Sequence, residues 1–250
     1  MRYLILGLLI ACGDPGPTPL FNGEDLTGWY TWRPTYGRDV DPDGMFAITD
    51  GNIHFLSQDI APAAYEFGYL ATTRDYTNFH LSFEYKWGER LYVNFGRDAG
   101  LFFAAVGPDQ LWPRSVECQV MVNDSGSMYL FDYATLETTI DPANPTPTYL
   151  EGGTPYVAPR NALHNYARVA RGPVVDSSTE WNTVEVIARG QDAEFIVNGT
   201  TTFRSTGRMQ PHPDFPDDPA MDVPLTGGRL VLQQEGSEVM FRNLLVEELP

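Results

Sequence analysis

The sequence is short of positive charge. It holds 16 Lys and Arg residues against 33 Asp and Glu residues, and its formal net charge is −17 at pH 7. A chain with this excess of negative charge repels a phosphate backbone, which argues against nucleic acid as a partner. Neutral or cationic substrates are compatible with it.

Motifs of the common catalytic and cofactor sites are also missing. The sequence contains no CxxC pair and no HExxH, GxSxG or phosphate-loop motif. It therefore carries no zinc, nucleophilic-serine or nucleotide signature of the usual kind. It also shows no long helical periodicity and no repeat of about 20 to 50 residues, which argues against helical bundles and solenoids.

Cysteines and long apolar runs are scarce. The apolar run in MRYLILGLLIAC is too short to span a bilayer, and it ends at Cys12 in a sequence that resembles a bacterial lipobox. We expect residues 1–12 to be a lipoprotein signal peptide with Cys12 lipidated, which would anchor the protein in the bacterial cell envelope, on the periplasmic or the outer surface. An ordinary secretory signal is the alternative. With Cys12 acylated, Cys118 has no partner for an intrachain disulfide.

The sequence is rich in short strand-like segments. In residues 79–87, FHLSFEYKW, apolar and polar side chains alternate, and Asp50-Gly51 and Asn198-Gly199 are typical of two-residue hairpin turns. Roughly ten to fourteen such strands without helices predict an all-β sandwich, most simply a jelly roll. We expect one domain over residues 20–250, after a tether rich in Pro and Gly at residues 13–19.

Two stretches interrupt this pattern of strands. Residues 132–180 and 205–226 are rich in proline and show little strand pattern, so we predict two long loops. Such loops can wall a cleft above a sheet, and solvated loops without a function are the alternative. The second loop has several Asp residues between positions 214 and 222. A divalent cation such as Ca²⁺ is one interpretation of them, and a solvated acidic loop is the other.

Polar side chains on two of the predicted strands indicate a binding surface. Glu117 and Gln119 alternate with apolar residues along one strand, and Glu84 and Lys86 do so along another. If both strands lie in one sheet, the four side chains converge. Carboxylates and amides bind sugar hydroxyls, while aromatic rings stack on sugar C–H faces, so one interpretation of the pattern is a carbohydrate site. A sheet face that is merely solvated is the alternative. Aromatic residues near these strands are Tyr92, Trp112 and Tyr129.

Six segments run in order over nearly all of residues 20–250: LFNGEDLTGW (20–29), GYLATTRDYTNFHLSFEYKWG (68–88), VGPDQLWPRSVECQV (106–120), EWNTVEVIARG (180–190), IVNG (196–199) and LVLQQEGSEVMFRNLLVEEL (230–249). Together they closely resemble the 3-keto-disaccharide hydrolase domain family. The F-N-G-x-D-L-x-G-W motif and the VECQV strand are the specific parts of the match. The resemblance implies a concanavalin A-like jelly-roll sandwich and cleavage of glycosides already oxidised to a ketone at sugar C3.

The chemistry that this resemblance implies begins at the ketone. A C3 ketone acidifies the C2 proton, so a base can remove it while an electrophile stabilises the enolate oxygen; the C1 substituent then leaves and water adds. Glu117 is the first candidate for the base or for a metal ligand, although no metal is identified. Lys86, Arg97 or Arg114 could supply the positive charge that stabilises the enolate oxygen. The catalytic candidates are Glu117, Gln119, Lys86 and Arg97, and the substrate-binding candidates are Glu84, Asp98, Trp112, Arg114, Tyr129 and Glu235.

The chain departs from the family pattern at three positions. The segment that commonly reads D-S-G-L-L-Y-H ends here in Ala104, so the histidine is replaced, and positions where further acidic residues are usual hold Val122 and Ser127. These changes leave two interpretations open. One is an active 3-keto-glycoside hydrolase, and the other is a carbohydrate-binding lipoprotein that keeps the fold without the chemistry.

Overall fold

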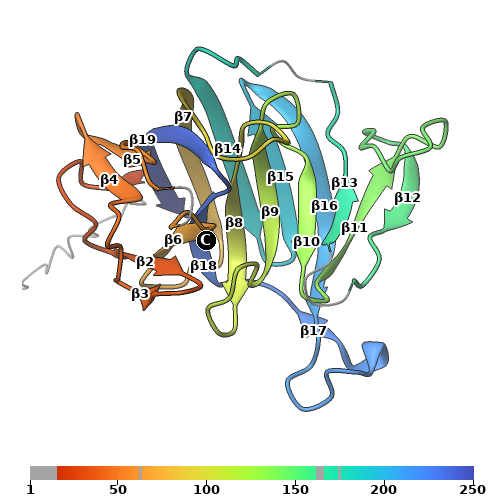
Figure 1. Cartoon of the computed structure of the whole chain (residues 1–250). Helices are drawn as coiled ribbons and strands as arrows, with labels where there is room; N and C mark the ends of the chain where they lie inside the picture. The colour runs from red at the N-terminus through yellow and green to blue at the C-terminus, as the bar shows by residue number, and fades with distance from the viewer. Residues whose placement is uncertain (1–15, 62–63, 162–165, 174–175) are drawn as a thin grey trace, which may run out of the picture.

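The computed structural model describes residues 16–61, 64–161, 166–173 and 176–250. In this part of the chain, two antiparallel sheets pack face to face, and the one helical element is a short 3₁₀ turn, Pro219–Met221 (Figure 1). The prediction of an all-β jelly-roll sandwich is confirmed. The predicted signal peptide and Cys12 lie outside the described residues. No helix in the described part of the chain is long and apolar enough to cross a membrane.

The larger sheet has eleven strands. Its order is β12 (Thr154–Val157), β11 (Thr135–Ile140), β16 (Thr200–Gln210), β15 (Asp192–Val197), β14 (Asn182–Arg189), β7 (Phe79–Leu91), β19 (Ser237–Glu248), β5 (Asn52–Phe55) and β4 (Phe46–Thr49). Two short strands pair beside this path: β1 (Thr18–Pro19) pairs with β19, and β17 (Val223–Pro224) pairs with β16.

The smaller sheet has eight strands and carries the site described below. Its order is β13 (Tyr166–Val169), β10 (Met128–Phe131), β9 (Arg114–Met121), β8 (Asp98–Val106), β18 (Arg229–Gln234), β6 (Gly68–Thr72), β2 (Trp29–Arg33) and β3 (Gly37–Arg38). Consecutive strands β8, β9 and β10 are neighbours, while β18 joins them from near the C-terminus.

Both predicted hairpin turns are present. Asp50 and Gly51 connect β4 to β5 with φ values of 52° and 74°, and Asn198 and Gly199 connect β15 to β16 with φ values of 48° and 76°. Positive φ at both central residues is the geometry of a type I′ turn, whose twist matches that of the flanking strands.

The predicted long loops are only partly loops. Residues 132–180 contain β11, β12 and β13, so the expectation of little strand structure there is wrong. Pro155 did not prevent pairing because β12 is an edge strand, where a missing N–H costs no ladder bond. In the second stretch, β16 continues to Gln210, and the excursion is confined to residues 211–222, which project from the sandwich (Figure 1).

Both ends of the described chain lie within the sandwich. The predicted tether ends in β1, where Thr18 pairs with Val246 and Pro19 with Leu245, so its last two residues belong to the sheet. The run 230–249 forms central strands, as predicted. However, its two strands lie in different sheets: β18 lies between β8 and β6, and β19 lies between β7 and β5.

The core lies between the sheets, and alternation along each strand defines it. On β7, the side chains of Phe79, Leu81 and Phe83 are buried against the other sheet. On β9, the core side chains are Val116, Cys118 and Val120. The opposite face of β9 is buried as well, because Glu117 is only 2% exposed and Gln119 only 5%. Other side chains of the protein therefore cover the outer face of the eight-stranded sheet around Glu117 and Gln119.

Candidate active site

A pocket of about 310 Å³ lies over the outer face of the eight-stranded sheet. Its polar groups come from neighbouring strands: Glu117 and Gln119 from β9, Asp98 from the start of β8, and Glu235 from the turn that follows β18. The lining is otherwise mainly aromatic and apolar. The complete lining is Phe95, Asp98, Trp112, Glu117, Gln119, Met121, Tyr129, Phe131, Tyr166 and Glu235.

The strand register explains why Glu117 can enter the pocket. Residue 100, on β8, pairs with Gln119 of β9 on one side and with Gln233 of β18 on the other. It is a glycine, and the Glu117 carboxyl lies over it: a Cβ on residue 100 would come within 1.9 Å of Glu117 Oε1. The absence of a side chain at Gly100 therefore makes the space that the carboxyl occupies.

Burial raises the pKa values of all three acids of the pocket, and repulsion from neighbouring acids adds to the shift for Asp98 and Glu117. Burial raises the pKa of Asp98 to about 8, and the charge and hydrogen bond of Glu235 add to the shift. Burial also raises the pKa of Glu117 well above its usual range, with further contributions from Glu235 and Asp98. The pKa of Glu235 is raised by burial too. The pocket therefore disfavours the charged forms of its carboxyl groups relative to water.

Hydrogen bonds hold these side chains in place. Glu235 Oε1 accepts the indole N–H of Trp112 at 3.1 Å and the side-chain amide of Gln233. Gln119 Oε1 accepts the backbone N–H of Val120 at 2.9 Å, so its NH₂ group is the donor left for the pocket. No hydrogen-bond donor in the described chain reaches Asp98 Oδ1, which is buried. A buried carboxyl oxygen without a donor disfavours the charged form, in keeping with the raised pKa of Asp98.

Aromatic rings form one wall of the pocket. Trp112 and Phe131 are stacked with their centroids 6.2 Å apart, and Tyr166 lies 5.0 Å from Tyr129. At the mouth, Tyr166 and Phe95 are 55% and 48% exposed. Ring faces beside carboxyl and amide groups form the combination that binds sugars, whose C–H faces stack while their hydroxyls form hydrogen bonds.

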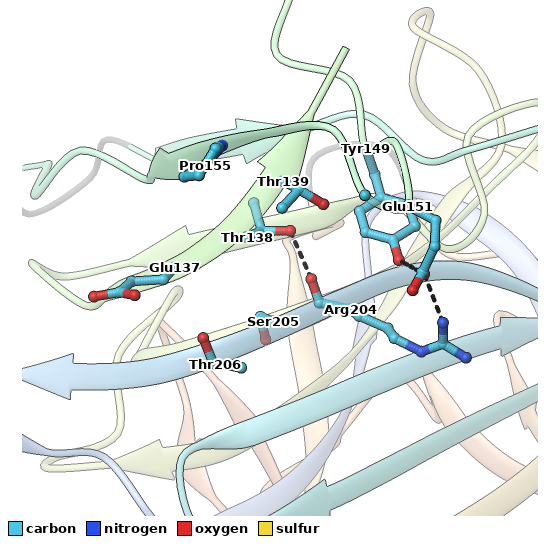
Figure 2. A pocket seen from close by; sticks show the side chains of 10 residues that line it. Glu137, Thr138, Thr139, Tyr149, Glu151, Pro155, Arg204, Ser205 and Thr206 are labelled. Carbon is cyan, nitrogen blue, oxygen red and sulfur yellow. Dashed lines mark hydrogen bonds and ion pairs between the residues drawn. The ribbon is translucent and has the colours of Figure 1, made fainter.

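A second hollow, of about 320 Å³, lies on the eleven-stranded sheet between β11, β12 and β16 (Figure 2). Arg204 and Glu151 pair with each other in the hollow, and Glu151 also accepts the Tyr149 hydroxyl. The side chains of Arg204 and Glu151 are 46% and 67% exposed. Paired, exposed charges are typical of a solvated surface, so we place the candidate active site in the acidic pocket.

Comparison with known proteins gives the family. A family model for the 3-keto-alpha-glucoside-1,2-lyase-like domain matches residues 16–247. The chain belongs to this family. Membership supports a carbohydrate-active protein, and it agrees with the family predicted from the sequence segments. A search of curated proteins found no match.

Solved structures share the fold. A candidate glycosyl hydrolase from Parabacteroides distasonis has a TM-score of 0.54 and 22% sequence identity, with 94% of each chain covered. A second candidate glycosyl hydrolase from the same organism has a TM-score of 0.50 and 19% identity, with 88% of this chain and 99% of that chain covered. At these identities the likeness concerns the fold.

The structure brings six of the predicted site residues together and separates four. Asp98, Trp112, Glu117, Gln119, Tyr129 and Glu235 all line the pocket. Glu84 and Lys86 do not, because β7 lies in the other sheet and these side chains are on its outer face. The expectation that they share a surface with Glu117 is therefore wrong. Glu84 instead pairs with Arg242 at 2.7 Å.

The two predicted arginines are engaged elsewhere. Arg97 donates to the backbone carbonyl of Gly88. Arg114 holds Asp132 through its backbone carbonyl at 2.9 Å and its carboxylate at 3.1 Å. Both residues tie loops to strands, and neither is among the residues that line the pocket. The positive charge that the sequence predicted for this site is not supplied by these residues.

The family departures lie outside the pocket lining. Ala104 sits at the bulge of β8 with a φ of 50°, and its side chain is buried in the core. Val122 packs against the same core, and the Ser127 hydroxyl donates to Asp124 at 2.6 Å. Replacement of the family histidine by Ala104 therefore removes no group from the acidic pocket of this chain.

No group of three or more His, Cys, Asp or Glu residues in the described ranges has the geometry to hold a metal ion. This applies to the acids of the pocket and also to Asp214, Asp217, Asp218 and Asp222 in the excursion. The arrangement does not fit the divalent cation that the sequence left open, and no step below depends on one.

Four pocket residues were missed in the sequence: Phe95, Met121, Phe131 and Tyr166. Tyr166 lies in the stretch interpreted as a loop, so its strand β13 was not recognised. Phe131 is on β10, and Tyr129, two residues earlier, was recognised. The period of two along β10 would have placed Phe131 on the same face as Tyr129.

Proposed function

We propose that the protein cleaves small glycosides whose sugar carries a ketone at C3. The observation that carries this proposal is the convergence of Asp98, Glu117 and Glu235, all with raised pKa values, in one aromatic-walled pocket. Family membership supports the same class of substrate. A ketone at C3 is what makes proton removal at C2 feasible for a carboxylate base.

In this proposal Glu117 is the base. Its carboxylate removes the C2 proton, and the electron pair moves to the C3 oxygen as an enolate. The enolate then re-forms the ketone as the bond between C1 and the aglycone oxygen breaks. The burial that raises the pKa of Glu117 makes its ionised form a stronger base than an ordinary glutamate.

The leaving group needs a proton donor, and the enolate oxygen needs a hydrogen-bond donor. Asp98, whose pKa is raised to about 8, donates its hydrogen bond to Glu235 in the free protein; with substrate bound, it gives this proton to the departing aglycone oxygen. The amide of Gln119 donates to the C3 oxygen. Water then adds to C1 as a hydroxyl while Glu117 returns a proton to C2, and the remaining proton of the water restores Asp98. A neutral donor in a buried site stabilises developing charge because it is already oriented.

The size and charge of the pocket restrict the substrate. A volume of about 310 Å³ is near the lower end for ligand sites, so it accommodates one sugar ring and part of an aglycone rather than a polymer. Three carboxyl groups without a cation among the lining residues disfavour acidic sugars. Neutral glycosides are therefore the expected substrates.

The test is aglycone release from a 3-keto-4-nitrophenyl glucoside, with the unoxidised glucoside as control and a chelator in parallel. Release from the ketone alone supports the proposal. Incubation in D₂O should also place deuterium at C2 of the product. Binding without release would instead favour the second candidate, a sugar-binding protein, which the exposed rings of Phe95 and Tyr166 would serve equally well.

A further inference from the structure

The connection between β8 and β9, residues 107–113, folds back over the outer face of the eight-stranded sheet. It carries Trp112, which forms part of the pocket wall and donates its indole N–H to Glu235 at 3.1 Å. The Gln110 side chain donates to the Trp112 carbonyl at 3.1 Å, which gives the segment local order. The position of Trp112 therefore depends on what holds this segment against the sheet.

Asp109 holds it, through donors from four strands. Its Oδ1 accepts the hydroxyl of Tyr30 at 2.7 Å, the hydroxyl of Tyr69 at 2.9 Å and the guanidinium of Arg229 at 2.7 Å. Its Oδ2 accepts Arg38 Nε at 2.5 Å. The carboxylate is 12% exposed and lies outside the pocket lining.

These donors favour the charged form of Asp109. Burial acts to raise its pKa, but the hydrogen bonds from Arg38, Tyr30 and Tyr69 outweigh burial and hold the pKa of Asp109 below its ordinary value. Arg229 also donates to the carbonyl of Gly107 at 2.9 Å, at the start of the same segment. Charge-assisted bonds from two arginines and two tyrosines thus converge three residues before Trp112.

We propose that Asp109 is a positioning residue for the active site. It fixes residues 107–113 on the sheet, and it thereby places Trp112 against Phe131 and beside the Glu235 carboxylate. This inference rests on the proposed function for its effect on turnover, but its effect on Trp112 can be measured without any substrate. Asp109 itself does not touch the space where the substrate would lie.

The experiment compares Asp109→Asn with Asp41→Asn. Asp41 is a matched control because it is 13% exposed, pairs with a buried arginine, Arg33, at 3.2 Å, and accepts two backbone N–H groups outside the pocket. Acrylamide quenching of tryptophan fluorescence is measured for each variant with and without Trp112→Phe. The difference isolates the Trp112 signal from the other four tryptophans.

The Trp112 signal should become more accessible to acrylamide in Asp109→Asn and stay unchanged in Asp41→Asn. For an active parent, kcat/KM should fall by about 10²-fold in Asp109→Asn, since displaced positioning groups typically cost this much. That loss should largely disappear when Trp112→Phe is already present, because both changes act through one side chain. Unchanged Trp112 quenching would overturn the inference, whatever the melting temperature does.

The experiment tests the proposed function and the positioning role of Asp109 independently. If the parent releases no aglycone but Trp112 becomes accessible in Asp109→Asn, the proposed function fails and the positioning role is supported. If turnover is present and Trp112 does not respond, the positioning role fails alone. Should Asp109→Asn not fold, Arg38→Gln replaces it as the test variant. Arg38 is 53% exposed, so we expect the fold to tolerate this change. Trp112 should again become more accessible to acrylamide, by a smaller amount.

Discussion

The Glu117 carboxyl lies on the outer face of the sheet, in the space that a side chain at Gly100 would need. A Cβ at residue 100 would lie 1.9 Å from Glu117 Oε1 and 2.9 Å from Gln233 Oε1. The obstruction involves the far ends of two flexible side chains and no backbone atom. A larger residue at position 100 therefore displaces the proposed base while the strands remain paired.

Gly100→Ala should consequently separate activity from stability. We expect turnover of a 3-keto-glycoside to fall by about 10²-fold through misplacement of Glu117, while unfolding changes by less than about 1 kcal/mol. Thermal melting and kcat/KM measured on the same preparation check this. Gly172→Ala is the control, because a Cβ there meets nothing closer than 3.7 Å. Full activity of Gly100→Ala would mean that Glu117 is not required where it lies.

A second prediction concerns Glu117 directly. Glu117→Gln keeps the shape of the side chain and removes its ability to accept the C2 proton, so the rate should fall by about 10²- to 10⁴-fold. Burial disfavours the charged form of Glu117, so the neutral amide should not lower the melting temperature at neutral pH. Unchanged turnover contradicts the role of base, and a large loss of stability indicates a structural role instead.

Much of the fold could be predicted because its signals are local. Asp50-Gly51 and Asn198-Gly199 specify hairpins by their backbone conformation, and alternation along residues 79–87 gives the two faces of β7. Alternation relates a side chain to its own strand only. It cannot show that β7 and β9 lie in different sheets, which is why Glu84 and Glu117 were wrongly placed on one surface.

The parts of the site that were missed depend on contacts between distant segments. Tyr166 reaches the pocket because β13 pairs with β10, where Tyr166 lies opposite Phe131. Asp109 is an ordinary loop acid in the sequence, and its role appears only when Tyr30, Tyr69 and Arg229 converge on it. Long-range pairing of this kind leaves no short sequence pattern.

A third prediction concerns the cell envelope, which the described residues do not test. We propose that Cys12 carries a lipid, and we expect the protein to incorporate labelled palmitate and to remain with the membrane fraction. Cys12→Ser should abolish the label and release the protein, with the enzymatic activity per molecule unchanged. A wild-type protein that is soluble and unlabelled would contradict the anchor and favour an ordinary secretory signal.

The last prediction uses pH to separate Asp98 from Asp109. The pKa of Asp98 is raised from 3.8 to about 8 by burial and by Glu235. A carboxyl with a raised pKa in the folded state stabilises the fold fully below pH 3.8, and this contribution is lost as the pH rises toward 8. Asp98→Asn removes this dependence. It should therefore raise the stability at pH 9 by about 1 to 3 kcal/mol and change it little near pH 3.5, while turnover falls.

Asp109 should behave in the opposite way. Its pKa is lowered by hydrogen bonds that outweigh burial, so its contribution to stability is present above the unfolded-state pKa and is lost as the pH falls through the folded-state value. Asp109→Asn should destabilise the protein at neutral pH and have a diminishing effect in acid. Urea unfolding of parent and both variants at pH 3.5, 7 and 9 checks both signs in one series. If Asp98→Asn destabilised the fold at pH 9, the ionised Asp98 would have to be paired in the native protein, and it could not serve as the proton donor proposed for it.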